Sequence, residues 1–229
     1  MSNKVIGIEG LVGAGKTSIC RELLDLVPNS ILLHGGNLYR AIIFALMNLE
    51  KQKIKLNNLE ENVKNIDIKA LMDKLQIRLE IENRETVIYV GNKKIDEEEI
   101  QSKEASLAVS IAGKSADNSK FYIFGRNLID AYKEKFNVIV SGRDLMNIYP
   151  NLDYHFLITA SLEERIRRKC IQYNGKAEYE EIKNNIITRD KLQEEAGYYK
   201  KYENTIEIDV TNFKSANEGA NEVLKYINL

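Results

Sequence analysis

The feature that most constrains the fold is a glycine-rich segment near the N-terminus, residues 10–17, which reads GLVGAGKT. A short run of β-branched apolar residues, Lys4–Glu9, comes before it, and such a run bounded by glycine is typical of a buried strand. Apolar residues at helical spacing follow over Lys16–Val27. The segment matches G-x-x-x-x-G-K-[ST] in the required strand–loop–helix context, which predicts a phosphate-binding loop.

The residue types of this loop explain how it would hold phosphate. Glycines let the backbone wrap closely, so that successive N–H groups point at phosphate oxygens, and the following helix adds the partial positive charge of its N-terminus. The lysine reaches the β- and γ-phosphates, and the hydroxyl after it ligates Mg²⁺. The residues expected to bind the nucleotide are Gly10, Gly13, Ala14, Gly15, Lys16, Thr17 and Ser18, with Thr17 as the Mg²⁺ ligand. The alternative is a glycine-rich turn that merely ends a strand, and the pattern says nothing about a phosphoryl acceptor.

Strand and helix patterns alternate along most of the chain. Further apolar strands are expected at residues 31–33, 137–140, 154–159 and 205–210, and helices at 38–49, 101–112, 118–135, from 161, at 179–195 and at 215–227. Ser161 with Glu164, and Ser215 with Glu218, have the spacing of a capping box at the start of a helix. Because parallel strands need crossovers of this kind, the pattern predicts a P-loop NTPase-type three-layer α/β/α fold with a mostly parallel five-stranded sheet. In such folds the ligand lies at the carboxyl ends of the strands.

One stretch departs from this pattern. Between residues 53 and 102 the apolar residues alternate at period two, as in Leu75, Ile77, Leu79 and Ile81, which predicts a small antiparallel sheet. We therefore expect a core made of residues 1–52 and 103–229, interrupted by an inserted subdomain at 53–102.

Composition excludes several classes of partner. The 229 residues include 33 Lys and Arg against 34 Asp and Glu, and a net charge of −1 offers no general attraction to nucleic acid or to an anionic membrane. Cys20 and Cys170 are the two cysteines, and their spacing fits neither a zinc site nor a disulfide framework. With no signal-peptide pattern and no apolar run of about 18 residues, we expect a cytoplasmic monomer.

Candidate site residues follow the expected strands. Gly35, Tyr39 and Arg40 come after the second strand, and Arg143 and Asp144 after the third. Glycine permits close approach, and an arginine fork suits phosphate. The alternatives are that Arg40 is a surface arginine and that Arg143 and Asp144 form a local ion pair.

A second group of arginines lies further along the chain. Arg165 and Arg168 share one helix face, Arg189 lies on the next helix, and residues 173–177 form an expected hinge between these helices. Arginines on a flap at about 165–192 suit phosphoryl transfer, which needs positive charge and exclusion of water. The alternative is a solvated basic face paired with Glu163 and Glu164.

These segments together resemble bacterial cytidylate kinases, the nucleoside monophosphate kinase family that phosphorylates CMP and dCMP. The resemblance runs over nearly the whole chain and rests on IEGLVGAGKTSIC, LLHGGNLYR, KKIDEEEIQSKEAS, VIVSGRD, ITASLEERIRRK and IEIDVT. It implies ATP as donor, Mg²⁺, and an acceptor-binding role for the inserted sheet. It also implies Lys16, Arg165 and Arg168 as catalytic cations. By resemblance, the acceptor-side residues are Gly35, Tyr39, Arg40, Arg143, Asp144 and Arg189, and Asp209 and Thr211 lie near the adenine loop.

The chain also departs from the family. The family usually has Asp-Ser where this chain has His34-Gly35. It usually has Asp-Gly-Arg-Asp at 141–144, where this chain begins with Ser141, and Gly-Glu-Ile-Arg at 98–101, where this chain ends with Gln101. A family arginine that helps hold the acceptor phosphate falls at Tyr122, and the charged run after Arg189-Asp190 reads KLQEE, with Gln193 in it. His34 is a weak candidate for a general base, because an anionic acceptor needs none, and His155 is expected to be structural.

Each missing charge-assisted hydrogen bond costs roughly 1.5–3 kcal/mol, or one to two decades of affinity. The retained donor side predicts ATP-dependent phosphoryl transfer to a nucleoside monophosphate, with CMP or dCMP as the favoured acceptor. The missing acceptor-side charges leave two alternatives open: a kinase for a different small acceptor, and a nucleotide-binding module without catalytic activity.

Overall fold

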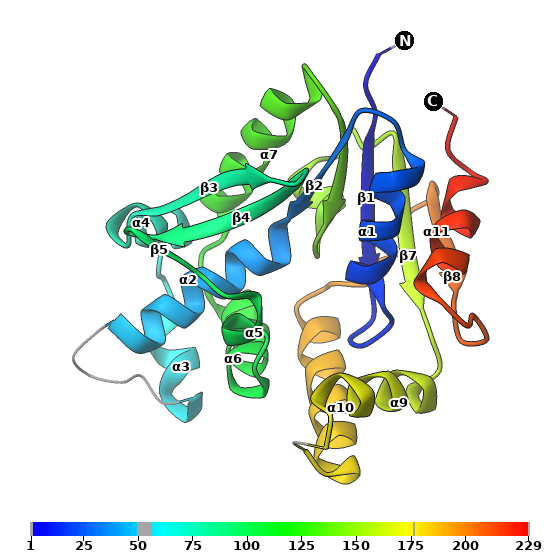
Figure 1. Ribbon diagram of the computed structural model, residues 1–229. Helices are drawn as coiled ribbons and strands as arrows, with labels where there is room; N and C mark the ends of the chain where they lie inside the picture. The colour runs from blue at the N-terminus through cyan, green and yellow to red at the C-terminus, as the bar shows by residue number, and fades with distance from the viewer. Residues whose placement is uncertain (1, 50–55, 176, 229) are drawn as a thin grey trace.

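The computed structural model of the chain describes residues 2–49, 56–175 and 177–228 (Figure 1). Its centre is a set of five parallel strands that are neighbours in this order: β2 (Ser30–His34), β6 (Asn137–Ser141), β1 (Val5–Gly10), β7 (Tyr154–Thr159) and β8 (Thr205–Asp209). These are the five strands that the sequence pattern predicts.

Successive residues of the central strands face opposite layers, which is why these strands are apolar throughout. On β1, Ile6 and Ile8 pack with helices α1 (Lys16–Leu26) and α11 (Ala216–Leu224). Val5 packs on the other face with the layer that contains α7 (Ser119–Lys133) and α8 (Leu145–Ile148). The predicted three-layer α/β/α architecture is confirmed.

The antiparallel strands differ from the prediction in one respect. Strands β3 (Ile77–Glu82), β4 (Glu85–Val90) and β5 (Lys93–Lys94) are antiparallel as expected, but β4 continues the main sheet beside β2. The backbone N–H of Leu32 donates to the Arg84 carbonyl at 2.8 Å, and the N–H of His34 donates to Thr86 Oγ1 at 2.8 Å. The expectation of a five-stranded sheet with a separate small one is therefore corrected to one eight-stranded sheet in the described part of the chain.

A second apolar core joins the inserted segment to the main body. It contains residues from α2 (Gly35–Leu49), α3 (Leu56–Val63), α4 (Ile68–Lys74), α6 (Lys103–Ser115) and the short α5 (Glu97–Ile100). The sequence pattern did not predict α3 and α4, whose buried residues include Leu59 and Ile68. The expected boundary at 52/53 lies outside the described residues, and a separate subdomain at 53–102 stays a prediction.

The expected flap consists of α9 (Leu162–Tyr173) and α10 (Tyr179–Glu195). Ser161 caps α9 by accepting a hydrogen bond from the Glu164 N–H at 3.3 Å, as its sequence spacing predicts. Ile166, Ile182 and Ile186 form a small core that includes Val12 of the glycine-rich loop. α10 also packs against α6. The two flap helices therefore contact both the glycine-rich loop, through Val12, and α6. Lys176 of the expected hinge lies outside the described residues.

The structure also describes the two cysteines and the apolar character of the helices. Cys20 is buried and Cys170 half-buried, and neither forms a disulfide. Within the described ranges, no helix combines the length and apolarity needed to cross a membrane.

Candidate active site

A cleft of about 990 Å³ opens where β1, β2 and β6 end. Its walls are the glycine-rich loop, the first turns of α2, parts of α6 and α7, and the flap helices. This is the sheet edge at which the sequence places the ligand.

The glycine-rich loop has the backbone geometry that requires glycine. Gly13 and Gly15 have φ values of 81° and 91°, in the left-handed region that other residues rarely adopt. A Cβ on Gly10 would lie 2.5 Å from the Ile158 carbonyl oxygen. The residue before α1 is Gly15, which has no side chain to cap the helix, so the first N–H groups of α1 can bind an anion in the cleft.

Among the cationic side chains that line this cleft, five lie close enough to affect one another's charge, and we call them the cation cluster: Lys16, Arg40, Arg143, Lys169 and Arg189. Desolvation, helped by the neighbouring arginines, lowers the pKa of Lys16 and of Lys169 to about 7. The same two causes lower the pKa of Arg40 to about 9 and that of Arg189 to about 10.

Nearby carboxylates, among them Glu97 and Asp190, balance only part of the charge of the cluster. The Nε atoms of Arg40 and Arg189 are buried and have no hydrogen-bond partner among the described residues. Buried charges without partners are costly, and the lowered pKa values report the same cost. A ligand with several negative charges would supply the missing partners, so the arrangement suits a polyphosphate.

The two arginines expected to be catalytic are held by other contacts, and of the two only Arg168 lines the main cleft. Arg165 donates to the carbonyl oxygens of Ala160 at 3.1 Å and Val12 at 3.2 Å, and it pairs with Asp190. Its side chain supports the glycine-rich loop rather than joining the cation cluster.

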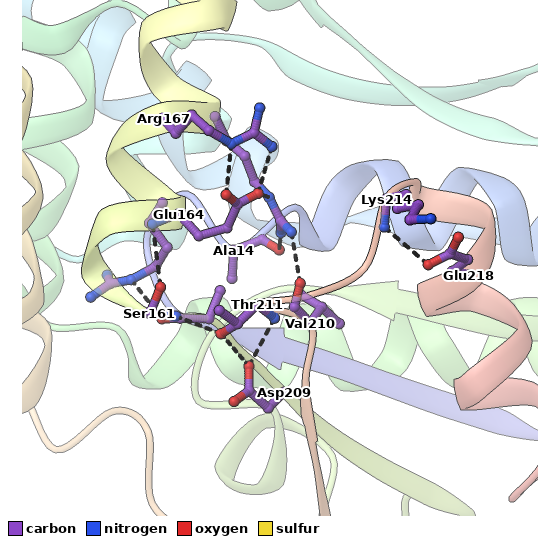
Figure 2. Close-up of polar contacts among 12 residues, drawn as sticks. Ala14, Ser161, Glu164, Arg167, Asp209, Val210, Thr211, Lys214 and Glu218 are labelled. Atoms are coloured by element: carbon purple, nitrogen blue, oxygen red, sulfur yellow. Dashed lines mark hydrogen bonds and ion pairs between the residues drawn. The ribbon is translucent and has the colours of Figure 1, made fainter.

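Arg168 has a similar place. Its donors reach Glu164 Oε1, the Ala14 carbonyl and the Val210 carbonyl, each at 2.7 Å. Arg167 also pairs with Glu164 (Figure 2), as the solvated-face alternative expects. Both expected catalytic arginines thus bind backbone oxygens around the loop, and Lys169, which the sequence pattern did not single out, is the flap cation near Arg40 and Arg189.

Asp209 and Thr211 lie at the end of β8 beside the contacts of Arg168 (Figure 2). Thr211 donates its N–H to Asp209 Oδ1 at 2.8 Å and accepts from the Ser161 N–H at 2.9 Å. Thr211 lines a second, shallower hollow of about 510 Å³ together with Ser161 and Arg167. Asp209 and Thr211 do not line the main cleft.

Five of the six expected acceptor-side residues line the main cleft, whereas Asp144 follows Arg143 without lining it. The Tyr39 hydroxyl donates to Asn118 Oδ1 at 2.7 Å. Arg143 donates from Nε to Gln193 Oε1 at 2.7 Å and lies over the Tyr199 ring. The local Arg143–Asp144 ion pair is not among the contacts of the described residues, and Arg40 is a cleft residue rather than a surface one.

Asp144 has two neutral donors instead of an arginine. The Tyr122 hydroxyl donates to Asp144 Oδ2 at 2.8 Å, and Asn147 Nδ2 donates to Oδ1 at 2.7 Å. Burial raises the pKa of Asp144, although the Tyr122 hydrogen bond opposes this. The predicted acceptor-side residues are therefore brought together, with Tyr122 and Gln193 in direct contact with two of them.

Both histidines have structural partners. His34 Nε2 lies 2.7 Å from Oε2 of Glu85, the first residue of β4, which pairs with β2. His155 contacts Glu9 at 3.3 Å and Thr205 at 2.9 Å. Glu9 also accepts the Leu145 N–H at 2.6 Å. Through Glu9 and Thr205, His155 therefore connects β7 to β1 and β8.

Comparison with known proteins gives a consistent family. The family model described as cytidylate kinase matches residues 6–229. A cytidylate kinase from Halalkalibacterium halodurans is 27% identical over an alignment of 236 residues, covering 99% of this chain and 98% of that protein. One from Clostridioides difficile is 28% identical and covers all of both chains. Among solved structures, thymidylate kinase from Candida albicans has a TM-score of 0.44 at 12% identity, covering 98% of this chain and 90% of that one.

Proposed function

The chain belongs to the cytidylate kinase family, and we propose that it transfers the γ-phosphoryl group of Mg·ATP to a nucleoside monophosphate, with CMP or dCMP as the acceptor. The observation that carries this proposal is the cation cluster. Its five cations, two of which have Nε atoms without a hydrogen-bond partner among the described residues, line one cleft beside the glycine-rich loop. Two phosphorylated substrates, meeting end to end, would neutralise such a cluster.

On the donor side, the loop N–H groups and Lys16 would hold the ATP phosphates. Thr17 lines the cleft in the first turn of α1, where its hydroxyl would hold Mg²⁺. The described residues contain no group of three or more His, Cys, Asp or Glu side chains suited to a metal, so phosphate oxygens and water would complete the coordination. The ion would neutralise charge on the phosphates.

On the acceptor side, Arg40, Arg143 and Arg189 would bind the monophosphate. Its attacking oxygen is already anionic at neutral pH, so this chain needs no general base for the transfer. The contribution of the protein is to align the two phosphates and to neutralise charge in a cleft from which the flap excludes water. Lys169 would add its charge from the flap side.

A different small phosphorylated acceptor is the second candidate. Tyr122 and Gln193 stand where the family usually carries charge, and they contact Asp144 and Arg143 respectively. This change favours altered acceptor recognition over loss of the donor site. A nucleotide-binding module without turnover is the third possibility.

The test is ADP release from Mg·ATP with CMP, dCMP, UMP, AMP, GMP and non-nucleotide phosphates as acceptors. Lys16→Ala should abolish turnover. Lys225→Ala should not, because Lys225 is an exposed lysine at the C-terminal end of α11 that pairs with Glu222. Stimulation by CMP or dCMP supports the first candidate, and stimulation by another acceptor alone supports the second. ATP binding without any stimulated turnover contradicts both kinase candidates.

A further inference from the structure

A polar network lies beside the cation cluster and begins on the phosphate-binding helix. Arg21 of α1 donates from Nη2 to Glu97 Oε2 at 2.7 Å and from Nε to Glu85 Oε2 at 3.0 Å. Glu97 is the first residue of α5, and Glu85 begins β4. The Arg21 side chain thus connects α1, the helix that follows the glycine-rich loop, to α5 and β4 of the inserted segment.

Glu97 is the centre of this network. Its Oε1 accepts from Asn37 Nδ2 at 3.0 Å and from Gln101 Nε2 at 2.6 Å, while Oε2 accepts from Arg21. Hydrogen bonding to Arg21 and Asn37 lowers the pKa of Glu97 against the opposing effect of burial. An ionised carboxylate can accept all three donors, whereas an amide in its place would turn an NH₂ group toward at least one of them.

The network continues to the flap. Because Glu97 accepts the NH₂ group of Gln101, the Gln101 carbonyl oxygen points the other way, and it accepts from Gln172 Nε2 of α9 at 3.3 Å. Arg21, Asn37, Glu97, Gln101 and Gln172 all line the main cleft. The contacts form a continuous path from α1 through α5 to the flap.

We propose that Glu97 is a positioning residue that couples the phosphate-binding helix α1 to the flap, through Arg21 on one side and Gln101 with Gln172 on the other. Its role in catalysis rests on the proposed function. Phosphates bound at the N-terminus of α1 fix that helix, Arg21 transmits its position to Glu97, and Glu97 sets the orientation of the amide that holds the flap. An isolated exposed ion pair would have little effect, but here one carboxylate orients three donors from three places in the fold.

The first experiment uses hydrogen exchange and needs no acceptor. Wild type, Glu97→Gln and Glu99→Gln are compared with and without a non-hydrolysable Mg·ATP analogue. Glu99 is the matched control, since it lies on the same helix and pairs with the exposed Lys93. In wild type and in Glu99→Gln, the analogue should increase protection at residues 97–102 and 168–175. In Glu97→Gln, the analogue should bind within about threefold of wild type while this protection is lost.

The outcomes separate the two proposals. Equal protection in Glu97→Gln and wild type, or no added protection in wild type, overturns the coupling. Failure of every acceptor to stimulate turnover overturns the proposed function and leaves the exchange result standing.

The second experiment measures kinetics with the acceptor that gives turnover. Glu97→Gln should raise the acceptor KM and lower kcat, together by about tenfold to a hundredfold in kcat/KM, as expected for a lost charged hydrogen bond. Arg21→Lys should retain part of the activity that Arg21→Met loses. The double variant Arg21→Met with Gln172→Ala should be no worse than the more severe single variant, because both break one path. Additive losses would overturn the coupling.

Discussion

Replacing Arg189 by methionine should make the folded protein more stable while weakening its affinity for phosphates. Arg189 is 4% exposed, its Nε has no hydrogen-bond partner within the described part of the chain, and Arg143 lies close enough to lower its pKa further. At neutral pH the guanidinium is charged in both the folded and the unfolded chain. Its lowered pKa means that the charge costs free energy in the folded state alone, so removing the charge favours folding.

The size of the gain follows from the pKa. A tenfold change in proton affinity is worth about 1.4 kcal/mol, so a fall from 12.5 to about 10 corresponds to about 3 kcal/mol. Methionine keeps most of the apolar stem, and water in the cleft solvates part of the charge. We therefore expect the free energy of unfolding to rise by about 1–3 kcal/mol, which is about 2–4 °C in Tm for each kcal/mol in a chain of this length.

Urea unfolding followed by far-UV circular dichroism, in a buffer free of phosphate and sulfate, measures this change. Arg126→Met is the control, because Arg126 is an exposed arginine that donates to the Ile148 carbonyl at 3.0 Å; it should leave stability unchanged or slightly lower. The affinity of Arg189→Met for the acceptor should fall at least tenfold. A lower free energy of unfolding for Arg189→Met than for wild type would refute the argument that burial of the Arg189 charge among the other cations destabilises the folded state.

Three further predictions concern the flap, the acceptor side and a helix cap. Lys169 is charged below its pKa of about 7, so affinity for the ATP analogue should fall as pH rises above 7. Binding should be accompanied by proton uptake, which calorimetry in buffers of different ionisation enthalpy measures. Lys169→Arg should make the affinity less dependent on pH. Tyr122→Phe removes a donor from Asp144 and should raise the acceptor KM about fivefold to tenfold. Ser161→Ala removes the cap on the Glu164 N–H and should lower the free energy of unfolding by about 1 kcal/mol.

Each of these predictions has a result that contradicts it. Binding heats that do not depend on the buffer would exclude proton uptake by Lys169. Tyr149→Phe, which removes a hydrogen bond to Asp130 outside the cleft, should leave the acceptor KM unchanged; an equal rise in both tyrosine variants would show a general loss of order. A Ser161→Ala variant as stable as wild type would mean that the cap is replaced by water.

The parts of the fold that the sequence predicts are those whose signals are local. The glycine-rich loop carries its own backbone requirement, since Gly13 and Gly15 adopt a positive φ. The caps at Ser161 and Ser215 use a side chain and an N–H three residues apart. The central strands are continuous apolar runs because helices cover both of their faces.

The features that the sequence does not predict depend on contacts between distant residues. β4 joins β2 through a hydrogen bond to the Arg84 carbonyl and one to the Thr86 hydroxyl, each more than fifty residues from its donor. α3 and α4 have only eight and seven residues, so their apolar periodicity is too brief to distinguish from the surrounding alternation. Their burial is decided by α2 and α6, which a pattern within one segment cannot reveal.

The roles of the flap cations illustrate this limit best. Arg168 and Lys169 lie three and four residues after Arg165, so both are its neighbours on a helix surface, and spacing alone cannot tell which of them belongs to the cation cluster. The choice is made by Ile166, whose packing against Val12, Ile182 and Ile186 fixes the rotation of α9. That rotation turns Arg165 and Arg168 toward backbone carbonyls and leaves Lys169 to the cluster. The consequence is chemical: an amine with a pKa of about 7 can lose its proton under physiological conditions, whereas a guanidinium in the same place could not.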